Sequence, residues 1–389
     1  MIRILITGMD TPELLSRHVG IIADDLTSAA DGAGPFLPWA GSARVRRGAV
    51  VPTRERVLSV DTGSRGQTEA GAADAVARAA AALAGRGMLY KTMDSTLRGH
   101  VRAELAAALH ASKRRLLVVA PAFPAAGRVT RAGIQYVHGE RVDASGYAAD
   151  PVHPARTARL LDLIDPVIGP ARVVPQDADA AQLRDAARQA RALILDATTQ
   201  AALDERVAQL WTHGSCLWAG SPGLASALAA RCGDAAAGPL GMPRARRVLV
   251  VIGSANPASR AQGDALRTAG AQVAVLADEI GPGARLACLM APATPQADPA
   301  AVLAALVRQA MLALARRRFD GLIATGGDTL AALLDALAID AFTLTCELAP
   351  GFPAGTADCA GRQLAIAMKA GGFGGPGTLR DAAWRLLCR

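Results

Sequence analysis

Short apolar runs, each ending in a polar loop and followed by a helical pattern, recur along the first 130 residues. The runs are Val19–Ala23, Leu58–Asp61, Met88–Tyr90 and Leu116–Ala120. Continuous apolar runs of this length are typical of strands that are buried on both faces of a parallel sheet, with helices as the crossover connections. The sequence therefore predicts an α/β fold with a mostly parallel sheet flanked by helices.

A second series of the same kind follows residue 245, beginning with the apolar run Arg247–Ile252. A segment rich in Ala, Gly and Pro precedes it, and 389 residues are enough for two domains. We predict two α/β domains with the active site in the cleft between them. The expected boundaries are an N-terminal extension or first strand at 1–18, a first domain at 19–232, a linker at 233–245 and a second domain at 246–389.

The composition favours a globular protein that binds a small acidic molecule. Hydrophobic residues make up 51% of the chain, so Ala, Val, Leu and Ile can form two cores. The net charge of +8 comes from scattered arginines, which suits an acidic substrate better than a nucleic acid. The six cysteines and six histidines show no metal-binding spacing, and no apolar run reaches the ~18 residues of a membrane span. We expect a cytoplasmic protein that acts on a small molecule, without a membrane or nucleic-acid partner.

Polar residues gather where three of the first four predicted strands end. Lys91, Asp94 and Arg98 follow the third strand, and Lys91 is one of only three lysines among 42 basic residues. Asp24 and Asp25 follow the first strand; helix capping needs only one of them. Open α/β sheets bind ligands at the carboxyl ends of their strands. These loops predict a site for a small polar anion rich in hydroxyls, although Lys91 could also be a lysine by chance.

Two glycine-rich loops of the second domain suggest phosphate binding. Thr325–Thr329 joins a strand to a helix, and Lys369 is followed by four glycines within six residues. Glycine lets the backbone N–H groups approach an anion, and a helix N-terminus favours negative charge. Neither a Walker A motif nor a Rossmann G-x-G-x-x-G after a first strand is present. The loops favour a nucleotide site of another type and phosphoryl transfer to the acid held by the first domain.

Several motifs, in order from about residue 19 to 380, resemble those of the four-carbon acid sugar kinase family. They are Ile22–Thr27, Asp61–Arg65, Tyr90–Lys91 with Asp94–Gly99, Ala120–Pro124 with Gly127–Arg128, Gly253–Ser254, Thr325–Thr329, Glu347 with Pro350–Gly351, and Lys369–Gly374. The resemblance implies an ATP-dependent kinase, using Mg²⁺, that phosphorylates the terminal hydroxyl of D-threonate, D-erythronate or 3-oxo-tetronate. It also implies that the first domain binds the acid and the second binds ATP.

The resemblance also implies roles for individual residues. The substrate-binding residues would be Asp24, Asp25, Arg65, Lys91, Thr92, Met93, Asp94, Ser95 and Arg98. The ATP-binding residues would be Ser254, Gly326, Gly327, Asp328, Thr329 and Gly371. Arg65 and Lys91 suit the C1 carboxylate of the substrate, because each supplies positive charge and donors. Lys369 would neutralise charge on the transferring phosphoryl group, and the base that accepts the hydroxyl proton would be Asp24, Asp25 or Asp94. The metal ligands are not predicted.

Two segments depart from the family pattern. The family usually has Gly-Ala-Asn-Asp-Thr-Gly after its Asp-Asp-Leu-Thr motif, whereas here Ser28 replaces the glycine and Ala30–Ala33 stands for most of the rest. The family acidic-Asp-Pro-Gly segment appears as Glu347–Gly351. These changes leave an alternative open, a catalytically impaired sensor of sugar acids or nucleotides on the same scaffold.

Overall fold

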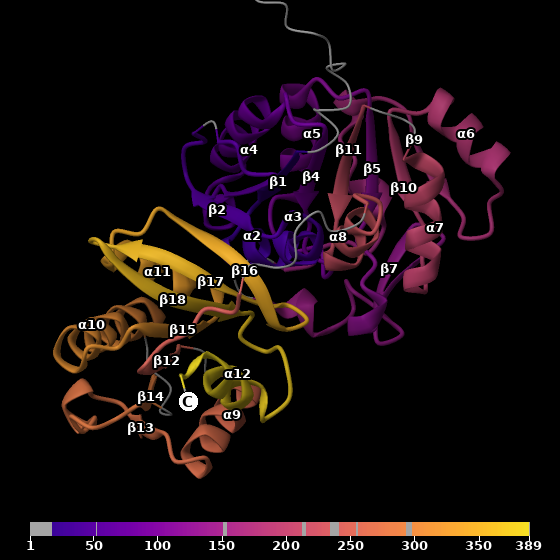
Figure 1. The fold of residues 1–389 in the computed structure, drawn as a ribbon. Helices are drawn as coiled ribbons and strands as arrows, with labels where there is room; N and C mark the ends of the chain where they lie inside the picture. The colour runs from indigo at the N-terminus through magenta and orange to yellow at the C-terminus, as the bar shows by residue number, and fades with distance from the viewer. Residues whose placement is uncertain are drawn as a thin grey trace, which may run out of the picture. The chain divides into compact units, whose positions relative to one another are not determined.

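The computed structural model describes residues 18–51, 53–150, 154–211, 215–233, 241–253, 256–292 and 298–388 (Figure 1). The predicted N-terminal extension lies outside these ranges except for His18, and so does most of the predicted linker.

The described residues form two compact units. The first lies within Met1–Asp24 and Ala49–Asp234, and the second within Asp25–Gly48 and Ala235–Arg389. Residues 25–48 therefore belong with the C-terminal part of the chain, unlike the continuous first domain expected from the sequence. The reason is long-range pairing, because strand β2 (Ala43–Arg47) pairs antiparallel with β16 (Ala341–Ala349).

The first unit is built on a parallel sheet. Among its described residues the strand order is β3-β1-β4-β11-β5-β10-β9, and every neighbouring pair is parallel. The strands are β1 (Val19–Ala23), β3 (Val57–Asp61), β4 (Met88–Thr92), β5 (Leu116–Ala120), β9 (Ala171–Val174), β10 (Ala192–Leu195) and β11 (Cys216–Gly220). All of them except β9 are buried at every position, which explains why their sequences are mostly apolar.

Helices cover this sheet (Figure 1). Helices α4 (Glu69–Leu83) and α5 (Val101–Ser112) pack against each other and share one apolar cluster with β1, β3, β4 and β5. The remaining helices are α6 (Ala180–Gln189), α7 (Gln200–Leu210) and α8 (Pro222–Ala229). A separate antiparallel sheet contains β6 (Arg128–Arg131), β7 (Ile134–Val137) and β8 (Glu140–Arg141).

The second unit has a mixed sheet. Its described strands run in the order β13-β14-β12-β15-β18-β17-β16-β2, parallel from β13 to β18 and antiparallel from β18 to β2. The strands not yet defined are β12 (Val248–Ile252), β13 (Gln272–Ala274), β14 (Leu286–Met290), β15 (Gly321–Thr325), β17 (Phe352–Cys359) and β18 (Arg362–Lys369).

The helices of the second unit lie on both faces of its sheet. Helix α10 (Pro299–Arg317) packs against α11 (Gly327–Ala336), and α9 (Pro257–Thr268) packs against α12 (Thr378–Leu386). Figure 1 shows α10 on the opposite side of β12 from α9 and α12. Helix α2 (Leu26–Ala33) also belongs to this unit and contacts α11, β17 and β18.

The α/β class with a mostly parallel sheet is confirmed, but the sequence pattern is misleading in two places. The apolar residues of 155–164 have helical spacing, whereas this segment holds only the short 3₁₀ turn Leu160–Leu163. The amide of Leu160 donates to the carbonyl of Gly133, and Leu160 packs into the core of the first unit, so the apolar spacing reflects tertiary packing. Strand β17 was not predicted because Pro353 and Gly355 are typical of loops.

Helix α10 is long and apolar enough to cross a membrane, judged by length and composition alone, in the window Pro299–Arg316. Arg308 and Gln309 interrupt its apolar sequence, so no continuous apolar run of about 18 residues occurs there. Its contacts with α11, β12 and β14 make it a covering helix of the sheet.

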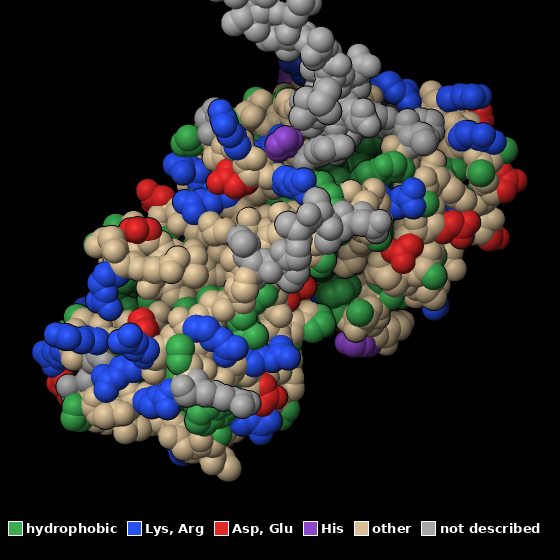
Figure 2. Space-filling view, viewed as in Figure 1, with side chains coloured by type: hydrophobic (Ala, Val, Ile, Leu, Met, Phe, Trp, Pro, Cys, Tyr) green, Lys and Arg blue, Asp and Glu red, His purple; other side chains and the backbone are tan. Residues whose placement is uncertain are grey.

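Figure 2 shows Lys and Arg side chains at many separate places on the visible face, interspersed with Asp and Glu.

Candidate active site

The carboxyl ends of β1 and β3 are joined by an ion pair. Arg65 Nε donates to Asp24 Oδ2 at 2.7 Å, and the Arg65 amide donates to the Asp24 carbonyl at 3.1 Å. Asp24 is 4% exposed, and its Oδ1 makes no hydrogen bond with any described residue. Burial raises the pKa of Asp24, but the charges of Arg65 and Lys91 outweigh it, so the net pKa lies below the usual 3.8. Asp24 is thus a buried carboxylate with one oxygen that no described residue satisfies.

Lys91, at the end of β4, forms a buried ion pair that the sequence did not predict. Its Nζ lies 2.9 Å from Glu104 Oε2 and donates to the Thr92 carbonyl at 2.7 Å. Ser64 Oγ donates to the other carboxylate oxygen of Glu104 at 2.5 Å. Glu104 lies in the first turn of α5 on its buried side with Val101 and Leu105. A charged residue at a core-facing position of an apolar helix was the signal available in the sequence.

The loop between β4 and α5 is held by its own aspartate. Asp94 Oδ2 accepts hydrogen bonds from Arg98 Nε at 2.5 Å and Thr96 Oγ1 at 2.7 Å. Burial raises the pKa of Asp94, but Arg98 and Arg65 outweigh it and lower it to about 2. Gly99 has φ 94°, and a Cβ there would lie 3.3 Å from Asp24 Oδ2. A glycine therefore lets this loop approach Asp24.

Two further residues border the same loop, Arg128 and Tyr147. Arg128 Nη1 donates to Ser95 Oγ at 3.2 Å, and Nη2 donates to the Tyr147 hydroxyl at 3.1 Å. The guanidinium carbons of Arg98 and Arg128 lie 5.7 and 5.9 Å from the centre of the Tyr147 ring, within the range of cation–π contacts. Arg128 belongs to one of the motifs that carry the family resemblance, whereas Tyr147 gave no sequence signal.

The other predicted substrate residues are placed differently. Met93 is 5% exposed and belongs to the apolar cluster of the first unit. Thr92 Oγ1 is buried and has no hydrogen-bond partner among the described residues. Asp25 caps helix α2 by accepting a 2.6 Å hydrogen bond from the Ser28 amide. It belongs to the second unit together with α2, whereas Asp24 belongs to the first unit.

In the second unit, the Gly326–Thr329 loop lies next to the end of β18. Gly326 has φ 89° and precedes α11, and its amide donates to the Lys369 carbonyl at 2.9 Å. A Cβ at Gly253 would lie 2.1 Å from Thr329 Oγ1, so the end of β12 lies close to the first turn of α11. Asp328 is exposed, and Ser254 lies outside the described residues. The structure thus places the Gly326–Thr329 loop next to Lys369, at the start of the glycine loop that contains Gly371.

Lys369 is fully buried at the end of β18. Its Nζ donates to the carbonyls of Ala370 at 2.9 Å and Gly371 at 3.0 Å, and no described carboxylate forms an ion pair with it. Burial lowers its pKa from 10.5 to about 8. The glycine loop is fixed by helix α9, because Ser259 Oγ donates to the Gly371 carbonyl at 2.6 Å. This arrangement holds a desolvated cation beside a glycine-rich loop, where an anionic ligand could supply the missing charge.

A group of acidic residues lies near α2 in the same unit. Burial together with the charges of Asp25 and Glu347 raises the pKa of Asp31 well above 3.8. Asp31 Oδ1 is buried and has no hydrogen-bond partner among the described residues. Within the described part of the chain, no group of three or more His, Cys, Asp or Glu could hold a metal ion by protein ligands alone.

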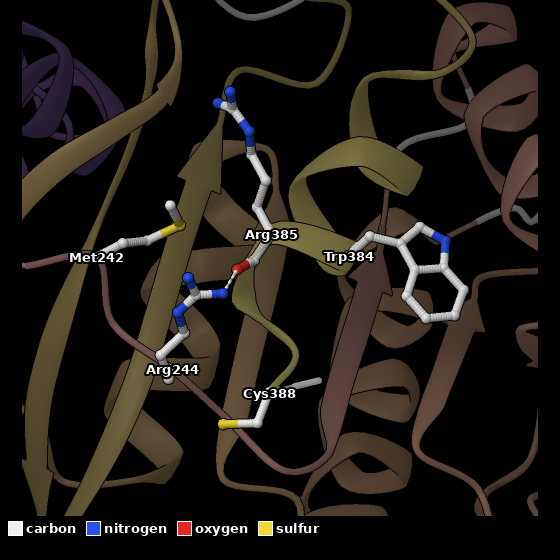
Figure 3. A pocket seen from close by; sticks show the side chains of 5 residues that line it. All are labelled: Met242, Arg244, Trp384, Arg385 and Cys388. Carbon is white, nitrogen blue, oxygen red and sulfur yellow. Dashed lines mark hydrogen bonds between the residues drawn. The ribbon is translucent and has the colours of Figure 1, made fainter.

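A cavity of about 630 Å³ in the second unit lies apart from the predicted site. Its lining residues are Met242, Arg244, Trp384, Arg385 and Cys388, none of which was predicted to bind a ligand. Figure 3 shows the Trp384 and Arg385 side chains leaving α12 in different directions, while Arg244 donates to the Arg385 carbonyl at 2.9 Å.

Comparisons with known proteins identify two family domains in the chain. Residues 19–228 match a family described as the sugar-binding N-terminal domain, and residues 290–379 match one described as the nucleotide-binding C-terminal domain. Two solved structures share the fold at low identity. A Salmonella typhimurium protein described as a tRNA synthase aligns over 94% of this chain and 98% of its own, with TM-score 0.79 and 22% identity. A Haemophilus influenzae protein aligns over 93% and 98%, with TM-score 0.72 and 21% identity.

Three curated relatives are similar over nearly their whole length. The D-threonate kinase of Bordetella bronchiseptica is 35% identical, covering 94% of this chain and 96% of the relative. The D-threonate kinase of Cupriavidus necator is 34% identical over 94% and 97%, and the 3-oxo-tetronate kinase of Brucella melitensis is 28% identical over 92% and 93%. The chain therefore belongs to the four-carbon acid sugar kinase family and, with it, to the carbohydrate-acid kinases.

Proposed function

We propose that this protein transfers the γ-phosphoryl group of ATP to the terminal hydroxyl of a four-carbon sugar acid in the cytoplasm. D-Threonate is the first candidate, because the relatives from Bordetella, Salmonella and Cupriavidus, 35%, 29% and 34% identical, are all D-threonate kinases. D-Erythronate and 3-oxo-tetronate are the other acids named for relatives. In this proposal the first unit binds the acid and the second binds the nucleotide.

The observation that carries the proposal is the state of Lys369. Its ammonium group is buried, has two backbone carbonyls as acceptors, and pairs with no described carboxylate. A buried cation without a counter-charge costs free energy unless a ligand supplies the charge. A phosphate group beside the Gly371–Gly372 backbone would do so. Lys369 then neutralises the charge that develops on the transferring phosphoryl group.

Among the three candidate bases, Asp24 suits the role best. Its Oδ1 has no hydrogen-bond partner among the described residues, so it can accept a proton from a substrate hydroxyl. Asp94 differs because both of its carboxylate oxygens accept hydrogen bonds, from Thr96 and Arg98, so neither is left for a substrate hydroxyl. Asp25 caps α2 and belongs to the unit proposed to bind ATP. Asp94 instead orients Arg98 and fixes the loop.

The residues of the second unit have separate roles in holding the nucleotide. Gly326, Gly327 and Thr329 would bind phosphates at the N-terminus of α11, where backbone N–H groups and the helix dipole favour negative charge. Mg²⁺ commonly binds through one or two carboxylates together with substrate phosphates. Asp31 suits it, because its buried Oδ1 has no partner among the described residues and two nearby carboxylates repel its charge. When bound, Mg²⁺ would shield the phosphate charges.

A coupled ADP-release assay with a panel of four-carbon acids tests the proposal. We expect turnover with ATP and one of D-threonate, D-erythronate or 3-oxo-tetronate, and ³¹P and ¹³C NMR of the product should place the phosphate on the terminal carbon. Lys369→Ala should abolish turnover, whereas Lys113→Ala, at an exposed lysine, should not. Thermal stabilisation by an acid and by ATP without turnover of any acid would support the sensor alternative and refute the kinase proposal.

A further inference from the structure

The four cationic side chains around the Asp94–Gly99 loop differ in how their charges are balanced. Arg65 pairs with Asp24 at 2.7 Å, Lys91 with Glu104 at 2.9 Å, and Arg98 with Asp94 at 2.5 Å. A second carboxylate, Asp150, lies 3.5 Å from Arg98. Each of these three cations therefore already has an anionic partner within the protein.

Arg128 is the exception. Its hydrogen-bond acceptors are the hydroxyls of Ser95 at 3.2 Å and Tyr147 at 3.1 Å, which are neutral. Within the described ranges no carboxylate forms an ion pair with Arg128, and its Nε is buried without any hydrogen-bond partner. A partly buried guanidinium with an unused donor is poorly solvated and lacks a counter-charge.

We propose that Arg128 binds the carboxylate of the substrate and so makes the enzyme specific for acids. This inference rests on the proposed kinase function and deepens it. It reassigns the carboxylate contact from Arg65 and Lys91, whose charges are already matched by Asp24 and Glu104. A planar guanidinium can bind a carboxylate through two parallel N–H groups, which an ammonium cannot do.

The surroundings of Arg128 are built to hold it in one orientation. Tyr147 accepts a hydrogen bond from Arg128 and contacts the guanidinium groups of both Arg128 and Arg98 with its ring. Ser95 is 4% exposed, and its carbonyl accepts a 2.8 Å hydrogen bond from Gln135, which is also buried. A fixed guanidinium loses little conformational entropy when it binds its ligand.

The Asp94–Gly99 loop connects this cation to the proposed base. It contacts Arg128 through Ser95 and approaches Asp24 at Gly99, where a Cβ would lie 3.3 Å from Oδ2. A short acid lying along the loop would have its carboxylate at Arg128 and its reacting hydroxyl toward Asp24. The carboxylate is then remote from the reacting atoms, so its contact contributes to binding of ground state and transition state alike.

Kinetics with the acid and its neutral amide test the inference. For Arg128→Gln we expect KM for D-threonate, or whichever of the three acids the wild type prefers, to rise roughly 10- to 150-fold, the range expected for losing one charged hydrogen-bonded contact. We expect kcat to change less, and KM for ATP to stay the same. With the amide of the same acid, wild type and variant should have similar kcat/KM. Arg131→Gln, an exposed arginine of the same strand β6, is the matched control and should leave all these values unchanged.

Two results would overturn the inference. One is a KM for the acid within about twofold of wild type in Arg128→Gln, since a charged contact contributes more than that. The other is an equal loss of kcat/KM for the acid and the amide, which would indicate a structural role. Arg128→Lys, which keeps the charge, should recover part of the acid preference and guards against misfolding. If the wild type turns over none of the acids, the kinase proposal fails, whatever the variants do. The role of Arg128 is then tested by calorimetric titration without ATP, in which Arg128→Gln should bind the acid more weakly than the wild type does.

Discussion

The ammonium group of Lys91 lies 2.9 Å from the carboxylate of Glu104, and both side chains are almost completely buried. The pair joins the end of β4 to the first turn of α5, and Ser64 adds the β3 loop through its hydrogen bond to Glu104. The ends of β3 and β4 are thus fixed to the start of α5. The pair makes Lys91 a residue that shapes this site, with its charge satisfied before any ligand binds.

Breaking this pair should be costly for stability. Glu104→Gln or Lys91→Met leaves one buried charge without its partner, so each should lower the free energy of unfolding by about 3–5 kcal/mol. The double variant Lys91→Met/Glu104→Gln removes both charges, so its loss of free energy of unfolding should be clearly smaller than the sum of the two single losses. Urea unfolding of the four proteins measures this coupling. Additive losses would show that the two charges do not depend on each other.

Asp94 should contribute to stability in a pH-dependent way. Its pKa in the folded protein, about 2, lies below the usual 3.8, so its contribution is fully present above pH 3.8 and is lost as pH falls toward 2. Asp94→Asn should therefore cost about 2 kcal/mol at pH 7. The difference in free energy of unfolding between Asp94→Asn and the wild type should shrink as the pH falls from 4 to 2.

The control for Asp94 is an exposed ion pair of similar geometry. Asp264 pairs with Arg267 at 2.6 Å, with both side chains largely exposed, so Asp264→Asn should change stability by less than about 1 kcal/mol. A similar loss in both variants would mean that burial of Asp94 adds nothing to its ion pair.

Much of the fold was predictable because its strands carry local signals. Val19–Ala23 and Leu116–Ala120 are continuous apolar runs, and the structure places β1 and β5 at these residues. The pairing of β2 with β16 joins residues about 300 positions apart and leaves no local pattern. This is why Asp24 and Asp25, adjacent in sequence, were assigned to one domain although the structure groups them with different units. In β17, a Cβ at Gly355 would lie 1.9 Å from the Thr343 carbonyl, so a residue typical of turns is required within a strand.

The candidate site was predictable as a set of polar loops, but the pairing of its charges was not. Strand-end positions indicated Lys91, Asp94 and Arg98 without any structure. Whether a cation is already neutralised depends on tertiary contacts, such as that between Lys91 and Glu104. Tyr147 likewise comes from a separate segment that approaches Arg98 and Arg128 only in the folded chain.

Lys369 should give nucleotide binding an alkaline limit. Its pKa of about 8 means that the ammonium is charged below pH 8 and neutral above it. If its charge binds phosphate, kcat/KM for ATP should fall above pH 8, approaching tenfold per pH unit. Lys369→Met should have low activity that does not fall further above pH 8. Lys113→Met, at an exposed lysine, should keep the wild-type pH profile. A flat wild-type profile from pH 7 to 10 would contradict this role.

Stability offers a second measure of the same group without any ligand. The folded-state pKa of Lys369 lies below its ordinary value of 10.5, so between about pH 8 and 10.5 the unfolded chain binds more protons. The Lys369 contribution to stability should therefore become more favourable as pH rises through this window. The stability advantage of Lys369→Met over wild type should be largest below pH 8 and decrease above it.

Asp24→Asn tests the proposed base. The asparagine keeps the size of the side chain and can still accept the hydrogen bond from Arg65, which is 2.7 Å from Oδ2 in the wild type. It cannot accept a proton from the substrate hydroxyl, so kcat should fall by about 10²–10⁴-fold. Calorimetric binding of the acid should be weakened much less. Asp196→Asn is the control, because the Asp196 carboxylate accepts hydrogen bonds from the amides of Ala132 and Gly133, and the variant should lose stability but keep kcat. If Asp24→Asn retained wild-type kcat while Asp94→Asn lost it, the base would be Asp94, and the buried oxygen of Asp24 would serve only to position the substrate.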